Sequence, residues 1–238
     1  KINRNFKING LDIKSDIDLK NFKFKNLLKL KDVFPKIKEY FIFQNQKLIL
    51  EYKKGNLKIN GKGDVLFQNK IDKIVYEIQK KDNEVKFDTK LKITNNAFQI
   101  NLLDFKKDKK SELNLNFIGK KNIKGKLVFS EIYFKEKNNV ISIKNLILSN
   151  NNKIEEIGNI NINYIDKKNF KNDIKLIKKS DNYLFSGNSF NINKIIDELL
   201  DSKDNKKIRI FNKNFKINFD IKKIYLDKDN IINNLKGI

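Results

Sequence analysis

The stretch "VKFDTKLKI" (residues 85–93) alternates apolar and polar side chains. Val85, Phe87, Leu91 and Ile93 fall on one side of an extended backbone, and three lysines fall on the other side. Successive side chains of a β-strand point to opposite faces of a sheet. This spacing therefore predicts a β-strand with one face buried and one face in water.

The same alternation recurs along most of the chain. It is clearest in the stretches 113–117, 126–129, 140–146, 157–164 and 215–221. Polar turns separate such stretches, for example at 81–83 and 137–139, and these turns are too short to hold a crossover helix. We therefore expect neighbouring strands to pair antiparallel.

So many consecutive strands predict a mainly β fold, in which an elongated antiparallel sheet curls into a trough, because a large open sheet must curl or split. We expect residues 1–238 to form a single repetitive β-domain with two short helices. The first is expected near 33–41, where Asp32 is a possible N-cap and Pro35 lies in the first turn. The second is expected near 192–202, where isoleucines and leucines recur at helical spacing behind Asn193.

The composition removes most kinds of catalytic site. The chain has no Cys, His, Met or Trp, which excludes thiol nucleophiles, imidazole bases and Cys/His metal sites. We expect no enzyme activity, no cofactor and no metal. The net charge is +23, but only Arg4 and Arg209 are arginines. Proteins that recognise nucleic-acid bases usually use the bidentate hydrogen bonds of the arginine guanidinium group. We therefore expect no specific nucleic-acid partner. An alternative function is a basic nucleic-acid-binding module whose affinity would fall steeply with salt.

Several local patterns resemble sites, yet each fits a structural role better. The glycine-rich stretch 55–64 lacks the GKS or GKT ending of a phosphate loop, and its alternation predicts a strand. The lysines at 106–110 fit an exposed turn. Glu155–Glu156 and the aspartates at 227 and 229 stand among lysines rather than in a recognisable polar cluster. The phenylalanines of 22–28 fall on the apolar side of a strand, which favours a core or groove lining over base stacking.

Longer segments carry a family likeness. The stretch "FSGNSFNINKIIDELL" (185–200) resembles a segment of the AsmA-like superfamily, in which a strand, a glycine, an aromatic residue and a short leucine-rich helix follow one another. Asn191 stands where an acidic residue is more usual. The stretches 34–41, 48–67, 143–162 and 224–237 are similar to its proline-containing helix and its repeated strand–turn–strand unit. The likeness covers most of the chain. The superfamily includes the YhdP-, AsmA- and TamB-like proteins.

The resemblance implies a non-enzymatic protein of the bacterial cell envelope. Such proteins form a periplasmic β groove, anchored at the inner membrane, that carries phospholipid toward the outer membrane. The chain begins with Lys1 rather than Met, so we expect an internal fragment whose membrane anchor lies outside it. Its expected partners are phospholipid acyl chains, with both membranes contacted through parts outside this fragment. Holding the roughly 30 methylenes of a phospholipid in water costs on the order of 20 kcal/mol, so an apolar floor has to carry the lipid.

The candidate groove lining follows from the apolar side of the strands. It comprises Val85, Phe87, Leu91, Ile93, Leu113, Leu115, Phe117, Leu127, Phe129, Ile141, Ile143, Ile160, Ile162, Phe215, Ile217, Phe219 and Ile221. The alternative is a structural or interaction protein, a β-sandwich or β-solenoid segment without a ligand. Alternation is the same in both cases, and two packed sheets would lie about 10 Å apart.

Overall fold

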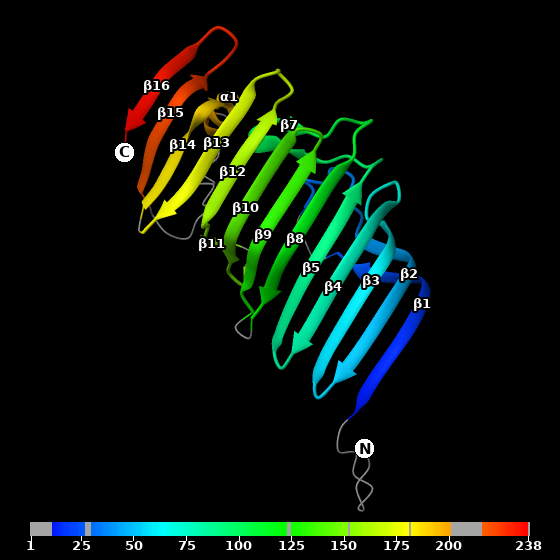
Figure 1. The fold of residues 1–238 in the computed structure, drawn as a ribbon. Coiled ribbons are helices and arrows are strands. Elements are labelled where there is room, and N and C mark those ends of the chain that lie inside the picture. The colour runs from blue at the N-terminus through cyan, green and yellow to red at the C-terminus, as the bar shows by residue number, and fades with distance from the viewer. Residues whose placement is uncertain are drawn as a thin grey trace, which may run out of the picture.

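The computed structural model describes residues 11–26, 30–122, 125–151, 153–180, 182–200 and 216–237, apart from the side chains of residues 198 and 199. These residues form one large curved sheet of 14 strands that does not close on itself, together with a two-stranded sheet and very little helix. The predicted mainly β, curled and elongated fold is confirmed. Figure 1 shows β1 and β16 at the opposite ends of the sheet.

The strands of the large sheet follow the chain in order, and a small insertion separates β5 from β8. The elements of the large sheet are β1 (Asp12–Lys25), β2 (Tyr40–Lys53), β3 (Asn56–Leu66), β4 (Asp72–Lys81), β5 (Glu84–Ile93), β8 (Leu113–Lys121), β9 (Leu127–Glu136), β10 (Asn139–Leu148), β11 (Ile154–Glu156), β12 (Asn159–Ile165), β13 (Lys171–Lys179), β14 (Asn182–Asn191), β15 (Lys216–Tyr225) and β16 (Ile231–Gly237). The insertion contains β6 (Gln99–Ile100), the 3-10 turn η1 (Asn101–Leu103) and β7 (Phe105–Lys106).

Neighbouring strands are antiparallel, as expected, except at one junction. β14 and β15 are parallel, with Phe185 opposite Phe219 and Gly187 opposite Ile221. The helix α1 (Asn193–Leu200) lies in the connection between them. A parallel pair needs such a crossover, so the helix predicted near 192–202 explains the exception. Its residues 201 and 202 lie outside the described part of the chain.

The strand register brings the apolar side chains onto one face, here called the inner face. One row of directly opposed residues crosses ten strands from β4 to β16. The row consists of Ile74, Leu91, Leu115, Phe134, Ile141, Ile162, Ile174, Gly187, Ile221 and Leu235. Because opposed residues of paired strands point to the same side, a single register choice makes the inner face apolar throughout.

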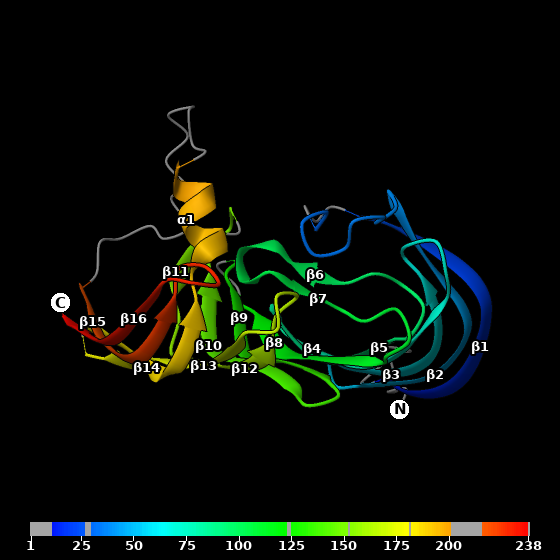
Figure 2. The ribbon, with the colours of Figure 1, turned by 90° about the horizontal axis from the view of Figure 1, so that it is seen from above.

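Two connecting segments cover part of this inner face. Residues 30–38, between β1 and β2, and the β6–β7 insertion both pack on it, through Phe34, Phe98 and Phe105. The Phe98 and Phe134 rings lie 5.6 Å apart, edge to face. Figure 2 shows β6, β7 and α1 on the same side of the sheet. Under these segments Ile93 and Leu113 are fully buried, with 0% of their surface exposed.

The prediction of a helix near 33–41 is wrong. Val33 and Phe34 donate their backbone N–H groups to the Leu30 carbonyl, so the segment makes turns, and β2 already begins at Tyr40. The Val33 carbonyl accepts from Gln99 of the insertion at 3.0 Å. The buried Phe34 ring lies 5.0 Å from that of Phe67. These long-range contacts hold the backbone in turns and outweigh the local signals of Asp32 and Pro35, since tertiary packing overrides propensity.

A buried polar cluster fastens the covered end of the inner face. Lys107 donates to the Thr94 carbonyl at 2.9 Å, and its ammonium faces the buried carboxylates of Asp72 and Glu136. Asn96 donates to Asp72 at 2.6 Å. Burial lowers the pKa of Lys107 and raises the pKa of Asp72. A buried charge is tolerated only where it is paired and hydrogen-bonded, so this cluster fixes the insertion to the ends of β4, β5 and β9.

Candidate functional site

The other end of the inner face holds an open groove of about 410 Å³ beside α1. Every residue that lines it is apolar. The lining consists of Ile160, Ile162, Ile174, Leu176, Phe185, Phe190, Ile192, Ile195, Ile196, Ile217, Phe219, Ile221, Ile224 and Leu235. The groove therefore has a floor made by β12–β16 and a wall made by one side of α1. We call it the α1 groove.

The helix forms a wall because its base is tied to the sheet while its axis leads away from it. Figure 2 shows α1 rising from the inner face. At its base, the Ile192 N–H donates to the Tyr225 carbonyl at 3.0 Å, and the Asn193 amide donates to the Leu226 carbonyl at 2.8 Å. Ile192, Ile195 and Ile196 then face the groove at helical spacing.

A second buried polar cluster holds the chain at this base. The Asn191 amide donates to Asp166 at 2.7 Å, and the Asn191 backbone N–H donates to the Asn172 side chain at 2.8 Å. Asp166 also accepts from the Lys168 and Phe170 backbone N–H groups, both at 2.9 Å. The polar atoms of this cluster are therefore hydrogen-bonded to one another and to the backbone. The cluster therefore positions α1 and leaves no buried donor or acceptor directed at a ligand.

The floor of the α1 groove is shaped by aromatic rings and one glycine. The Phe185 ring makes edge-to-face contacts with Phe190 at 5.6 Å and Phe219 at 5.9 Å between ring centroids. A Cβ at Gly187 would lie 2.2 Å from the Asp173 carbonyl oxygen. Only glycine allows this close approach at the bulge where β14 shifts its register with β13.

The structure divides the predicted lining residues into three groups. Ile160, Ile162, Ile217, Phe219 and Ile221 line the α1 groove. Ile93, Leu113, Leu115 and Ile141 are buried in the core and do not border the groove. Ile162 and Ile221 are also buried, at 7% and 1% exposure, but they border the groove. Half-buried positions on the same face are held by Val85, Phe87, Leu91, Phe117, Leu127, Phe129 and Ile143. Phe215 lies outside the described residues.

Sequence reasoning did not assign nine residues of the α1 groove to the lining. They are Ile174, Leu176, Phe185, Phe190, Ile192, Ile195, Ile196, Ile224 and Leu235. The helical spacing of Ile192, Ile195 and Ile196 is visible in the sequence and predicts an apolar helix face. Nothing local shows that this face stands over β12–β16, because that depends on the parallel junction.

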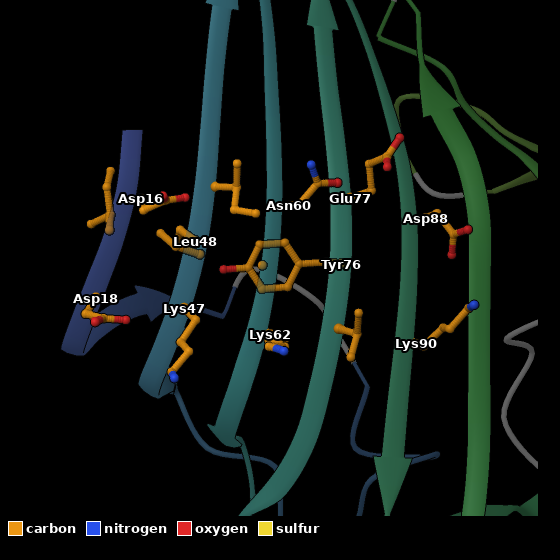
Figure 3. A pocket seen from close by; sticks show the side chains of 14 residues that line it. Asp16, Asp18, Lys47, Leu48, Asn60, Lys62, Tyr76, Glu77, Asp88 and Lys90 are labelled. Atoms are coloured by element: carbon orange, nitrogen blue, oxygen red, sulfur yellow. The ribbon is translucent and has the colours of Figure 1, made fainter. Parts of the chain in front are cut away.

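The outer face of the sheet is charged and has a different hollow. It measures about 670 Å³ and lies over β1–β5. Figure 3 shows acidic and basic side chains interspersed there. The register aligns Asp16, Asn60, Glu77 and Asp88 across the strands. Lys58 holds the pKa of Glu77 below its usual range through a contact of 3.1 Å. This face is the water-facing side that the alternation predicts.

Within the described ranges, no group of three or more acidic side chains lies close enough to hold a metal ion. Nor does that part of the chain contain a helix with the length and apolar character needed to cross a membrane. The α1 groove is the candidate functional site because it is open and its lining is entirely apolar.

Comparison with known proteins supplies no relative. No family model, curated protein or solved structure matches the chain.

Proposed function

We propose that the chain is a non-enzymatic segment of a periplasmic conduit, anchored to the inner membrane, in which an apolar β groove carries phospholipid toward the outer membrane. The α1 groove is the observation that carries the proposal, because its lining contains only apolar residues and lies open. The AsmA-like stretches in the sequence support the same function.

The dimensions of the inner face suit acyl chains. Neighbouring strands lie about 4.8 Å apart, so the floor of the α1 groove over β12–β16 extends about 19 Å. One acyl chain in a bilayer occupies about 15 Å, half of the hydrocarbon thickness. The floor of the α1 groove therefore accommodates the length of one chain.

The chemistry of the groove suits transport more than tight storage. Apolar burial stabilises an acyl chain by about 0.8 kcal/mol per methylene and has no preferred direction. Without polar groups in the lining, a chain can slide along the floor with no hydrogen bond to break. The lysines lie mainly on the outer face, where an exposed contact to a phosphate contributes only about 0–1 kcal/mol.

A closed sandwich is not the architecture of the described residues, which form one large open sheet and a small two-stranded sheet. An interaction surface without lipid remains the rival. In that case an apolar element of another protein would cover the inner face instead of acyl chains. Capture of a peptide by the groove, with no lipid, would favour this rival.

Site-specific photo-crosslinking separates these possibilities. A photoreactive residue at Phe219, in the α1 groove, is compared with one at Asn218, the neighbouring position on the outer side of β15. We expect phospholipid adducts, identified by mass spectrometry, at position 219 and none at position 218. Equal labelling at both positions, or adducts only at 218, would contradict the proposal.

A further inference from the structure

The hollow on the outer face of β1–β5 is bordered by two rows of directly opposed residues. One row, here called the acidic row, consists of Asp16, Ile49, Asn60, Glu77 and Asp88. The other, here called the basic row, consists of Asp18, Lys47, Lys62, Val75 and Lys90. Figure 3 shows the labelled members of the two rows on either side of Leu48 and Tyr76. The two sides of the hollow therefore carry mainly opposite charge.

Within each row, charges of the same sign face each other across neighbouring strands. Glu77 lies directly opposite Asp88, and Lys47 lies directly opposite Lys62. Like charges at directly opposed positions destabilise a sheet. A local arrangement that lowers stability in this way is typical of a surface that serves binding.

Elsewhere on the outer face an acidic side chain relieves this repulsion. Lys86 lies opposite Lys120, and both contact Glu84, at 3.7 and 2.7 Å. The hollow differs, because within the described part of the chain neither Lys47 nor Lys62 takes part in an ion pair, although both are exposed. The ammonium groups of the hollow are therefore available to carboxylates of a partner.

The hollow also exposes apolar surface among its charges. The side chains of Ile49 and Val75 are 41% and 51% exposed, although outward positions of such a sheet are usually polar. The five strands span about 19 Å, and the two rows lie about 7 Å apart, which is two residues along each strand. A fitting partner is therefore an elongated segment that carries both apolar and charged side chains.

A helix suits this hollow better than an extended peptide does. The backbone groups of β2–β5 pair with one another along the sheet, so the face of the sheet offers no hydrogen bonds to the backbone of a peptide. An α-helix makes its backbone hydrogen bonds within itself. At 1.5 Å per residue, about 13 residues of helix span the hollow, and side chains on its two flanks reach the two rows.

We propose that the outer-face hollow of β1–β5 binds an amphipathic helix of a partner protein. Basic side chains on one flank of this helix meet the acidic row, and acidic side chains on the other flank meet the basic row. Such a helix is close to neutral, so the pattern of charges recognises it rather than the net charge of +23. The inference concerns the outer face and stands whether or not the inner face carries lipid.

Two synthetic helices of about 14 residues provide the test. Both have the same composition, with a stripe of leucines and equal numbers of lysines and glutamates. The patterned helix has its lysines on one flank and its glutamates on the other, whereas the mixed helix has both kinds on both flanks. Fluorescence anisotropy of the labelled helices measures the two dissociation constants. We expect the patterned helix to bind about tenfold more tightly, because several exposed pairs of up to about 1 kcal/mol each are lost in the mixed helix.

A charge reversal in the basic row locates the binding. Lys62→Glu should weaken binding of the patterned helix roughly tenfold. The matched control is Lys175→Glu, the same change at an exposed outer position of β13, and it should leave binding unchanged. Lys62→Glu should also bind a helix with lysines on both flanks more tightly than Lys175→Glu does, a gain that a misfolded variant would not show.

Several results would overturn the proposal. They are an absence of binding by the patterned helix, equal affinity for the patterned and mixed helices, and equal losses in Lys62→Glu and Lys175→Glu. Self-association of the native chain in sedimentation velocity, abolished by Lys62→Glu, would assign the hollow to a second copy and would overturn it as well.

Discussion

A charge placed on the floor of the α1 groove is expected to prevent acyl-chain binding. Leu176 lies between Ile160 of β12 and Phe185 of β14 in the strand register. In Leu176→Asp the carboxylate remains hydrated, so an acyl chain loses contact across about one strand spacing, 4.8 Å of its 15 Å. This is about a third of the chain, or roughly five methylenes, and corresponds to about 4 kcal/mol. The dissociation constant should therefore rise by about a thousandfold.

The measurement is titration with a fluorescent fatty acid, followed by native mass spectrometry of the lipid-loaded protein. Asn161→Asp is the matched control, because it introduces the same charge on the outer side of β12, opposite Lys175. The half-buried Leu176 side chain contributes about 1–2 kcal/mol to folding, so circular dichroism should show a folded variant. A dissociation constant equal to that of Asn161→Asp would refute the idea that acyl chains lie on this floor.

Two further predictions concern the buried cluster at the covered end. Lys107→Met leaves the carboxylates of Asp72 and Glu136 buried without their cation, so urea unfolding should show a loss of about 3–5 kcal/mol, and a loss below about 1 kcal/mol would contradict this role. Burial raises the pKa of Asp72 above its usual value of 3.8, so the folded state binds this proton more tightly than the unfolded state. The associated stability is complete below pH 3.8 and is lost as the pH rises through the folded-state pKa. The unfolding free energies of the native chain and of Asp72→Asn, measured against pH, should diverge with that sign, and parallel curves would contradict it.

The alternation in the sequence predicts the strands and their shared face well. All predicted lining residues within the described part of the chain are on the inner face, because one period-two pattern and short turns fix the register. Alternation does not show which residues of the inner face are covered by other segments. Ile93 and Phe219 have equivalent patterns, yet the first is buried beneath the β6–β7 insertion and the second lines an open groove.

The missed features depend on contacts between distant residues. The parallel junction of β14 and β15 follows from a crossover whose end point no local signal specifies. The turns at residues 30–38 replace a predicted helix because Phe34 packs on Phe67 and Phe98. In both cases a tertiary contact, rather than local propensity, selects the backbone conformation.

The covered and open regions of the inner face have different physical roles. A wholly open apolar sheet would expose a large patch that promotes aggregation, and a wholly covered one would leave no space for a ligand. Segments 30–38 and 97–107 bury the apolar residues at one end and supply the packed core that a sheet requires for stability. The helix α1 is fixed at its base by Asn191 and Asn193 and rises beside β12–β16 rather than lying flat on them. An open apolar groove therefore persists beside a stable core, and this is the arrangement that a sliding acyl chain needs.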